Sequence, residues 1–353
     1  MTSTRAAPPR PARPATVPWQ HDAVSLPTRL GRLERVDRLG SGGFATVWLY
    51  HDAELDSDVA VKALAENWSQ RLDVRERFLE EARILRRADS DHIVRVYDIG
   101  EVDGTPYFVM TYADHGSLAR HLEPGVPMPV PRVVDLVSQA GAGLAVLHEH
   151  GVVHRDIKPQ NLLLRSGGSA GDRLLVADLG VAKAMLHASG LTQVVGTPAY
   201  MAPEQATGGG IDVRADVHAL AAVTYQMLTG RLARDGTIAD LAHATLPVAP
   251  SRLVPALPAA VDDVLLRALD PSPEARHPSV DAFVEDLRSA LPVTSLRAAP
   301  RVTRYQTPDT EFAPLPGTAP TRQRPSVLLL ALACLLVFVA TFGAAYAVIR
   351  LVT

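Results

Sequence analysis

Two short polar motifs in the middle of this chain constrain its fold more than any other feature. The first is His154-Arg-Asp-Ile-Lys-Pro-Gln-Asn161, and the second is Asp178-Leu-Gly180, which follows the apolar run Leu174 to Ala177. Chance occurrence of both motifs at this spacing is remote. They predict a catalytic site presented by loops on a scaffold with a substantial core, which 353 residues can supply.

The motifs contain the groups that phosphoryl transfer requires. That reaction needs a carboxylate to orient the attacking hydroxyl, metal ligands that bridge the phosphates, and a cation on the transferring group. Asp156 supplies the carboxylate and Lys158 supplies the cation. Asn161 and Asp178 supply the metal ligands. We therefore expect this chemistry at the two motifs.

Three histidines lie in or near the first motif, namely His148, His150 and His154. Their spacing also permits a transition-metal site. We disfavour that interpretation, because His154 already has a structural place in the motif.

Two earlier segments suit the same chemistry. The stretch Leu39-Gly-Ser-Gly-Gly-Phe-Ala-Thr-Val47 predicts a hairpin whose backbone can close over phosphates, although alone it would more often be a tip without a ligand. Val59-Ala-Val-Lys62 ends an apolar strand with a lysine in register to reach those phosphates. A buried lysine needs a partner of opposite charge, and we expect that partner to be Glu81, with Glu80 as the alternative. Taken alone, Glu81 would more often be a charged residue on the solvent-exposed side of a helix.

Composition excludes several other functions. The formal net charge is −3 with no long run of one sign, which argues against a protein that binds nucleic acid. The single cysteine, Cys334, lies in a C-terminal apolar run, so the rest of the chain has no thiol for a disulfide or a cysteine-based zinc site. Only Lys62, Lys158 and Lys183 are lysines, and two of them lie in the motifs above.

The pattern along the chain predicts a strand-rich part followed by a helical part. Residues 1–28 contain six prolines without hydrophobic periodicity and predict a disordered leader. Globular sequence follows, with helical spacing in the stretch Arg75 to Arg87. The β-like runs are Arg32–Leu39, Ala45–His51, Val59–Ala63, Val94–Ile99 and Tyr107–Tyr112. Further helical spacing is found at Val133–Leu147, Val261–Leu269 and Val280–Leu287.

The C-terminal part predicts a linker and a membrane helix. Residues 292–325 hold seven prolines and suit an extended linker. Val327 to Ile349 carries no charge, and a helix of this length spans a bilayer, so we expect a transmembrane helix at 326–349 and disfavour a buried core helix. Arg322 and Arg324 precede it, which places the large domain in the cytoplasm. Residues 350–353 would form a short tail outside, without a sensor domain.

At this point the chain resembles the protein kinase family, and within it the bacterial serine/threonine kinases of eukaryotic type. The resemblance covers about residues 29–290. Besides the motifs above, it rests on Gly196-Thr-Pro-Ala-Tyr-Met-Ala-Pro-Glu204, on Asp216 in Arg-Ala-Asp-Val-His-Ala-Leu, and on Arg276. It implies an α+β bilobal fold over 29–291, with a β-rich N-lobe at about 29–110 and a helical C-lobe at about 114–291, and with the transmembrane helix following.

The resemblance also implies where ATP and Mg²⁺ (or Mn²⁺) bind. Adenine would bond to the backbone of Thr111 and Ala113, beyond a gatekeeper at Met110, although the run Tyr107–Tyr112 is also simply a core strand. Val47, Ala60 and Leu163 would form apolar walls. The residues expected to cover or position the phosphates are Leu39, Gly40, Ser41, Gly42, Gly43, Phe44, Ala45, Thr46, Val47 and Lys62.

The remaining implied roles concern the activation segment, which is the segment between Asp178 and Glu204, and the catalytic loop, which is the motif from His154 to Asn161. Glu204 is expected to pair with Arg276, and Asp216 to support the backbone of the catalytic loop. Lys158 and Thr197 favour serine and threonine over tyrosine as acceptors. Arg155 precedes the catalytic Asp156 and is expected to pair with a phosphate on the activation segment. The expected phosphosites are Ser189 and Thr192, phosphorylated by a second copy in a transient homodimer, and the alternative is that both are ordinary loop residues.

Three positions depart from the family pattern without removing a catalytic group. Ala45 stands where a third glycine is expected, and Leu179 replaces the usual phenylalanine after Asp178. Ala221 stands where the family often has a glycine after Asp216.

Two other functions remain as alternatives. A catalytically weak pseudokinase scaffold at the membrane would keep the fold without turnover. A small-molecule phosphotransferase would lack the segment from Gly196 to Glu204 that docks protein substrates.

Overall fold

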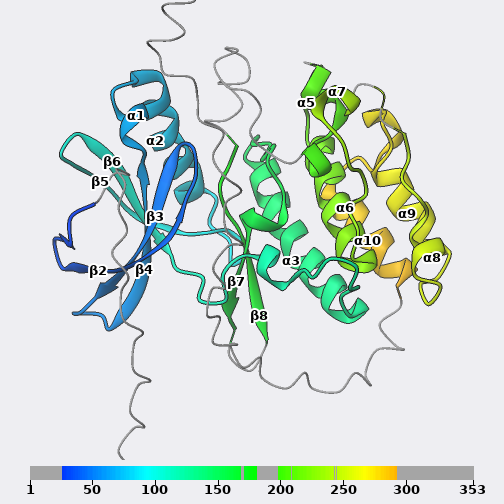
Figure 1. Cartoon of the computed structure of the whole chain (residues 1–353), viewed down its shortest axis with the longest axis horizontal. Coiled ribbons are helices and arrows are strands. Elements are labelled where there is room, and N and C mark those ends of the chain that lie inside the picture. Colours follow the sequence, from blue (N-terminus) through cyan, green and yellow to red (C-terminus); the bar gives the residue numbers. More distant parts are fainter. Residues whose placement is uncertain are drawn as a thin grey trace, which may run out of the picture. The chain divides into compact units, whose positions relative to one another are not determined.

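The computed structural model describes residues 26–167, 171–180, 198–207, 209–241, 243 and 245–291. The predicted linker, the predicted membrane helix and the predicted activation-segment sites Ser189, Thr192 and Thr197 lie outside the described residues. The described part consists of a strand-rich N-lobe followed by a helical C-lobe, in the predicted order (Figure 1).

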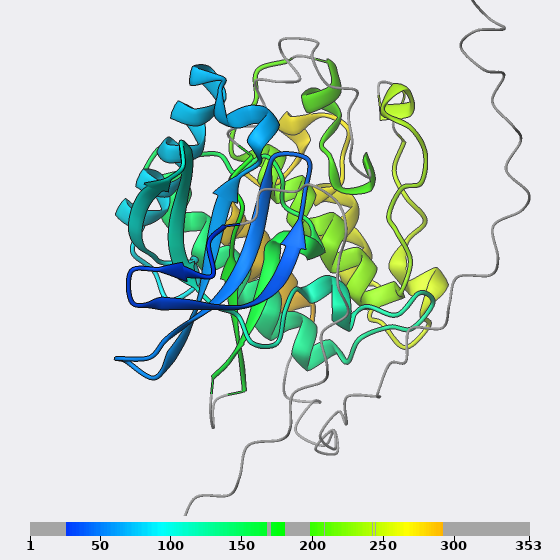
Figure 2. The same ribbon diagram turned by 60° about the vertical axis from the view of Figure 1, so that its left-hand side comes forward.

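The N-lobe is built on an antiparallel sheet with the order β1-β2-β3-β4-β6-β5 (Figure 2). Its elements are β1 (Arg29–Leu30), β2 (Leu33–Ser41), β3 (Ala45–Asp52), β4 (Ser57–Leu64), α1 (Glu66–Ser69), α2 (Leu72–Arg87), β5 (Val96–Val102) and β6 (Thr105–Thr111). In the central strand β4, Lys62 lies opposite Val47 of β3 and Phe108 of β6. This register places the predicted lysine beside the glycine-rich hairpin.

Helix α2 follows from one apolar stripe. Its buried residues include Val74, Phe78, Ala82 and Leu85, a spacing that forms a single helical face, and Phe78 packs against Phe108 of the sheet. Glu81 lies on the same buried face. The helix therefore presents a carboxylate to the sheet and not to solvent.

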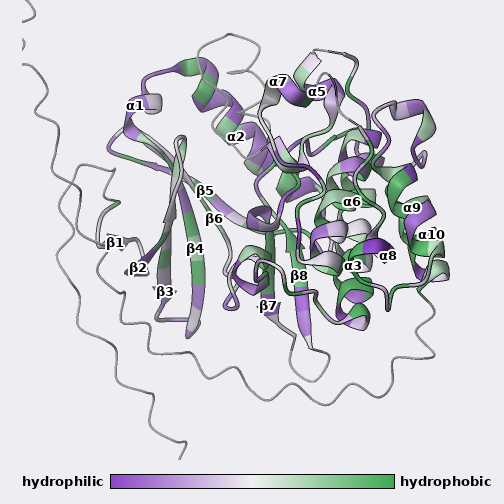
Figure 3. Cartoon of the chain, turned by 45° about the vertical axis from the view of Figure 1, so that its right-hand side comes forward, coloured by the Kyte–Doolittle hydropathy of each residue, from purple (hydrophilic) through white to green (hydrophobic). Residues whose placement is uncertain are grey.

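The C-lobe is a group of helices with a small hairpin on its N-lobe side. Its elements are η1 (Leu118–His121), α3 (Val130–Glu149), η2 (Pro159–Asn161), β7 (Leu162–Ser166), β8 (Asp172–Val176), η4 (Pro198–Tyr200), α5 (Pro203–Thr207), α6 (Arg214–Thr229), α7 (Ile238–Leu241), α8 (Pro250–Leu253), α9 (Ala260–Ala268), η5 (Pro273–Ala275) and α10 (Val280–Ala290). Helix α6 is buried on almost all sides. Figure 3 shows hydrophobic residues, in green, along α3 and β4.

Two glycines allow close packing in this lobe. A Cβ at Gly143 of α3 would lie 2.5 Å from the carbonyl oxygen of His92, so glycine lets α3 approach the loop before β5. Gly230 ends α6 with φ +69°, the left-handed conformation that favours glycine, and a Cβ there would lie 2.5 Å from Val126 N.

Among the described residues, α3 is the one helix long and apolar enough to cross a membrane. It packs against β8, α6 and α10, and half of its most apolar stretch is buried inside the protein. Its apolar character is therefore explained by its place in the C-lobe core.

The predicted strands are all present, but most of their ends differ from the predictions by one to three residues, and two of the differences at the edges of the N-lobe have a clear cause. The predicted strand at Val94 begins instead at Val96, because the backbone N–H of Val94 donates to Val176 of β8 and so joins the C-lobe hairpin. Leu26, assigned to the leader, is buried against Tyr50, Val61 and neighbouring residues of the sheet. The Tyr50 hydroxyl also donates to the Pro27 carbonyl at 2.7 Å.

Candidate active site

Lys62 lies at the centre of the candidate site. Its Nζ donates to Glu81 Oε1 at 2.8 Å and to Asp178 Oδ1 at 2.7 Å. These three residues come from β4, from α2 and from the segment after β8. Glu80, the alternative partner, is instead on the outer side of α2 and pairs with Arg83 and Arg87. The structure therefore selects Glu81.

The two carboxylates keep Lys62 charged despite its burial. Burial lowers the pKa of Lys62, but the charges and hydrogen bonds of Asp178 and Glu81 outweigh it, so the net shift of the pKa is upward. A lysine that stays protonated in a buried site is a fixed positive charge. Such a charge suits the binding of phosphate oxygens.

The loop from His154 to Asn161 brings its polar groups together. Lys158 Nζ lies 3.0 Å from Asp156 Oδ2 and 3.1 Å from Oδ1. The Asn161 amide nitrogen donates to the Asp156 backbone oxygen at 2.8 Å and to its Oδ2 at 2.9 Å. Asp156 is thus oriented by two neighbours, as an acceptor for a hydroxyl proton must be.

The same geometry suits a hard divalent cation. Because the nitrogen of Asn161 is used by Asp156, its amide oxygen is the atom that would bind a metal, together with the carboxylate of Asp178. Carboxylate and amide oxygens are the donors that Mg²⁺ prefers. These two residues fit the predicted metal site.

His154 holds this loop in place from the protein interior. It is fully buried, its Nε2 donates to the Ala177 carbonyl at 3.0 Å, and its Nδ1 accepts from the Asp156 backbone N–H at 3.3 Å. Burial lowers the pKa of His154, which favours the neutral ring that both bonds require. Asp216 accepts hydrogen bonds from the His154 backbone N–H at 2.7 Å and from His148 Nε2 at 2.9 Å.

The three histidines near this loop each have a hydrogen-bond partner within the protein. His148 is bound to Asp216, and His150 Nδ1 donates to the Val146 carbonyl at 2.8 Å. Across the described residues, no group of three or more His, Cys, Asp or Glu side chains is placed to hold a metal ion.

The glycine-rich hairpin lies between β2 and β3. It is closed by a hydrogen bond from Gly42 N to the Ala45 carbonyl at 2.8 Å. Val47 faces the core side of β3, whereas Thr46 is buried on the other face, where its hydroxyl accepts from the Trp48 indole at 3.3 Å. Of the predicted phosphate-covering residues, Thr46 thus has only its backbone available toward the site.

The predicted adenine site lies where β6 leaves the sheet. Met110 is buried and pairs with Ala60 across β4 and β6, and Thr111 is the last residue of β6. Leu163 of β7 and Val47 of β3 pack against the same core cluster as Ala60. The predicted apolar walls therefore come from both lobes.

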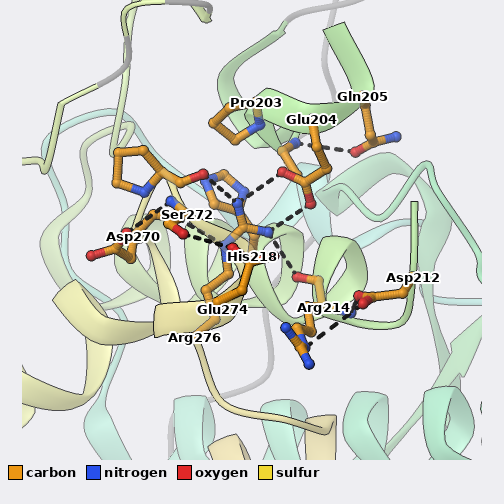
Figure 4. Close-up of polar contacts among 12 residues, drawn as sticks. Pro203, Glu204, Gln205, Asp212, Arg214, His218, Asp270, Ser272, Glu274 and Arg276 are labelled. Atoms are coloured by element: carbon orange, nitrogen blue, oxygen red, sulfur yellow. Dashed lines mark hydrogen bonds and ion pairs between the residues drawn. The ribbon is translucent and has the colours of Figure 1, made fainter. Parts of the chain in front are cut away.

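A second polar cluster braces the C-lobe (Figure 4). Arg276 donates from Nη1 and Nη2 to the two carboxylate oxygens of Glu204 at 2.7 and 2.8 Å. Its guanidinium also donates to the backbone oxygens of Asp270, Pro271 and Arg214. The predicted pair is buried and bidentate, and it fixes α5 against α6 and the segment before α10.

Sequence reasoning missed two residues that hold this region. Gln205 donates to the backbone oxygen of Arg155 at 2.8 Å and accepts from Ala202 N at 3.1 Å, which joins α5 to the catalytic loop. Its position directly after Glu204 was the available signal. Arg234 donates to His218 Nε2 at 2.8 Å beside the Glu204–Arg276 pair. No spacing in the sequence indicated that contact.

Comparisons with known proteins agree with this geometry. Residues 33–247, more than half of the chain, match the protein kinase domain. The chain is 38% identical over 284 residues to the serine/threonine-protein kinase Pkn1 of Myxococcus xanthus, covering 78% of this chain and 40% of Pkn1. It is 39% identical over 283 residues to PksC of Streptomyces coelicolor, covering 76% of this chain and 50% of PksC.

A solved structure shows the same fold. The crystal structure of the Mycobacterium tuberculosis PknI kinase domain aligns with a TM-score of 0.60 at 28% identity, covering 75% of this chain and all of that chain. The predicted bilobal fold is thereby confirmed. The chain spans half or less of the length of the relatives Pkn1 and PksC.

Proposed function

This chain belongs to the protein kinase family, among the eukaryotic-like serine/threonine kinases of bacteria, and we propose that it transfers the γ-phosphate of ATP to serine and threonine hydroxyls of proteins. The observation that carries the proposal is Lys62, bound at once to Glu81 and Asp178. Protein kinases require this lysine–glutamate pair and a metal-binding aspartate together for turnover.

Each group then has a role that its contacts support. Lys62 positions the α- and β-phosphates, and Asp156 orients the acceptor hydroxyl and takes its proton. Lys158, next to Asp156, stabilises the charge on the transferring group. Asn161 and Asp178 would hold Mg²⁺, which supplies charge neutralisation at the phosphate oxygens.

The proposal is tested by phosphate transfer from labelled ATP with the full-length chain in detergent. Lys62→Met and Asp156→Asn should each retain less than about a tenth of the parent rate on a protein acceptor, because each removes one required group. Circular dichroism checks that both variants are folded. Residual activity above that level would contradict the assigned roles. A panel that includes small-molecule acceptors tests the phosphotransferase alternative, and the filled catalytic positions speak against a pseudokinase.

We further propose that the protein is a single-pass membrane protein with the kinase domain in the cytoplasm. The support is the uncharged run Val327 to Ile349, preceded by Arg322 and Arg324. Extraction of membranes with alkaline carbonate should leave the chain in the pellet, and detergent should release it. Recovery of the full-length chain wholly in the soluble fraction would reject this proposal.

We also propose that a second copy phosphorylates the activation segment at Ser189 or Thr192. Arg155 is exposed beside Asp156, so a phosphate on this segment would give it an anionic partner. Confinement to a membrane would raise the effective concentration of neighbouring copies. A Ser189→Ala/Thr192→Ala variant should lose most of its activity. Full activity in that variant, with no other phosphate on the segment by mass spectrometry, would contradict the proposal.

A further inference from the structure

The tip of the glycine-rich hairpin makes three contacts with helix α1 and with Ala65, the residue directly before it. The indole Nε1 of Trp68 donates to the Gly43 carbonyl at 2.8 Å. The rings of Phe44 and Trp68 lie 5.1 Å apart at 37°, within the range of favourable aromatic pairs. The backbone N–H of Ala65 donates to the Phe44 carbonyl at 2.8 Å. Trp68 therefore provides two of the three contacts.

The hairpin tip itself leaves this conformation open to change. Gly40 and Gly43 do not have a positive φ, and a Cβ on either would meet no atom within 4 Å. The observed conformation therefore does not require glycine at these positions. Glycine instead keeps other backbone conformations accessible to the tip. A contact from outside the tip, such as that with Trp68, can therefore favour one of these conformations over the others.

The hydrogen bond to Gly43 also sets the direction of the next backbone N–H. In a planar trans peptide the carbonyl and the N–H point in opposite directions. Because the Gly43 carbonyl points at the indole Nε1 of Trp68, the N–H of Phe44 points away from that nitrogen. In Figure 1, α1 lies on the side of this hairpin away from the C-lobe helices.

Trp68 is also joined to the helix that carries Glu81. The backbone N–H of Arg71 donates to the Trp68 carbonyl at 3.0 Å, and the Arg71 guanidinium lies 5.9 Å from the centre of the indole ring. Arg71 is the residue directly before α2, and its side chain pairs with Asp73 in the first turn. The hairpin tip and the start of α2 thus share one aromatic residue.

We propose that Trp68 is a positioning residue for ATP, which holds the Gly43–Phe44 peptide with its N–H toward the nucleotide phosphates and ties this arrangement to α2. This inference rests on the proposed kinase function. Trp68 touches neither Asp156 nor Lys62 in the described contacts, so its effect should fall on nucleotide affinity and not on the chemical step.

The first test separates KM from kcat in the full-length chain. Trp68→Ala should raise KM for ATP about tenfold, which corresponds to one hydrogen bond and one aromatic pair, with a smaller change in kcat. Trp68→Phe keeps a ring but loses the N–H donor and should raise KM about threefold. Trp48→Phe is the matched control, because Trp48 contacts Arg35, Arg38 and Thr46 and not the tip. A KM within twofold of the parent in both folded Trp68 variants would overturn the inference.

The second test does not depend on turnover. The chain has three tryptophans, so a Trp19→Phe/Trp48→Phe variant leaves Trp68 as the only indole. Its emission should change saturably with a non-hydrolysable ATP analogue and Mg²⁺. Unchanged emission, with analogue binding shown by calorimetry, would overturn the inference. If emission responds while no phosphate is transferred, the inference stands and the proposed activity fails.

Discussion

Asp216 holds Arg155 in a backbone conformation that residues other than glycine rarely adopt. Arg155 has φ +65°, and its N–H donates to Asp216 Oδ1 at 2.8 Å. The other oxygen of this fully buried carboxylate binds the N–H of His154. Because Asp156 follows directly, the conformation of Arg155 determines where the carboxylate that we propose to be catalytic points.

Asp216→Asn should therefore impair both folding and catalysis. An amide keeps one acceptor oxygen but turns its NH₂ group toward one of the two backbone donors, which leaves that donor without its bond. We expect a loss of about 2–4 kcal/mol in the free energy of unfolding and a fall in kcat of about a hundredfold. Urea denaturation and steady-state kinetics measure the two effects. Asp212→Asn, at an exposed site before the same helix, is the control, and equal kcat in the two variants would contradict the role of Asp216.

Comparing Glu81→Gln with Glu80→Gln should show which of the two glutamates is the functional partner of Lys62. Glutamine keeps a hydrogen-bond acceptor for Lys62 but removes the negative charge. A hydrogen bond to a charged group contributes about 1.5–3 kcal/mol, so we expect kcat/KM for ATP to fall about ten- to a hundredfold. Glu80→Gln, one residue earlier and on the outer side of α2, should stay within about twofold of the parent. The reverse ranking would return Glu80 as the functional partner.

Arg276→Lys should test the bidentate brace to Glu204. Lysine cannot reproduce the two parallel N–H···O bonds or the three bonds to backbone oxygens. Damage to a buried pair costs about 3–5 kcal/mol, and at about 2–4 °C per kcal/mol the midpoint of thermal unfolding should fall by about 6–20 °C. Arg267→Lys, an exposed arginine near Asp286, is the control and should change the midpoint by less than about 2 °C. A similar shift of the midpoint in both variants would show that the bidentate pair of Arg276 and Glu204 contributes little to stability.

The sequence predicted those contacts that depend on motifs and periodicity. Lys62 and Glu81 were expected to pair because a charged side chain at the end of a buried strand needs a partner, and the structure places Glu81 on the buried face of α2. The buried pair of Glu204 and Arg276 followed from the family resemblance.

Contacts that depend on tertiary packing could not be predicted in this way. Val94 reads as part of an N-lobe strand, yet it pairs with Val176, more than eighty residues later in the chain, and local propensity contains no information on that partner. Trp68 lies on a helix of four residues, too short for a periodic pattern, so its contact with Gly43 had no signal in the sequence.

The stability of the described domain should fall as the pH decreases through the range of histidine titration. Burial lowers the pKa of His154, His218 and His277, and at His218 the charges of Arg234 and Arg276 lower it further, against a small opposing effect of the Tyr200 backbone. In the unfolded chain these residues take up a proton near pH 6.5. Below that pH the unfolded state binds more protons than the folded state, so the free energy of unfolding rises with pH in this range.

His218→Gln should reduce this pH dependence. The Gln amide oxygen can accept the hydrogen bond that Arg234 now donates to Nε2 at 2.8 Å, but glutamine does not titrate. Urea denaturation between about pH 7.5 and about pH 5.5, above the range of most carboxylates, should show a smaller loss of stability in the variant than in the parent. His150→Gln, at an exposed position after α3, is the control for replacing a histidine by glutamine and is measured at the same pH values. An equal slope in parent and His218→Gln would show that His218 takes up its proton alike in the folded and the unfolded chain.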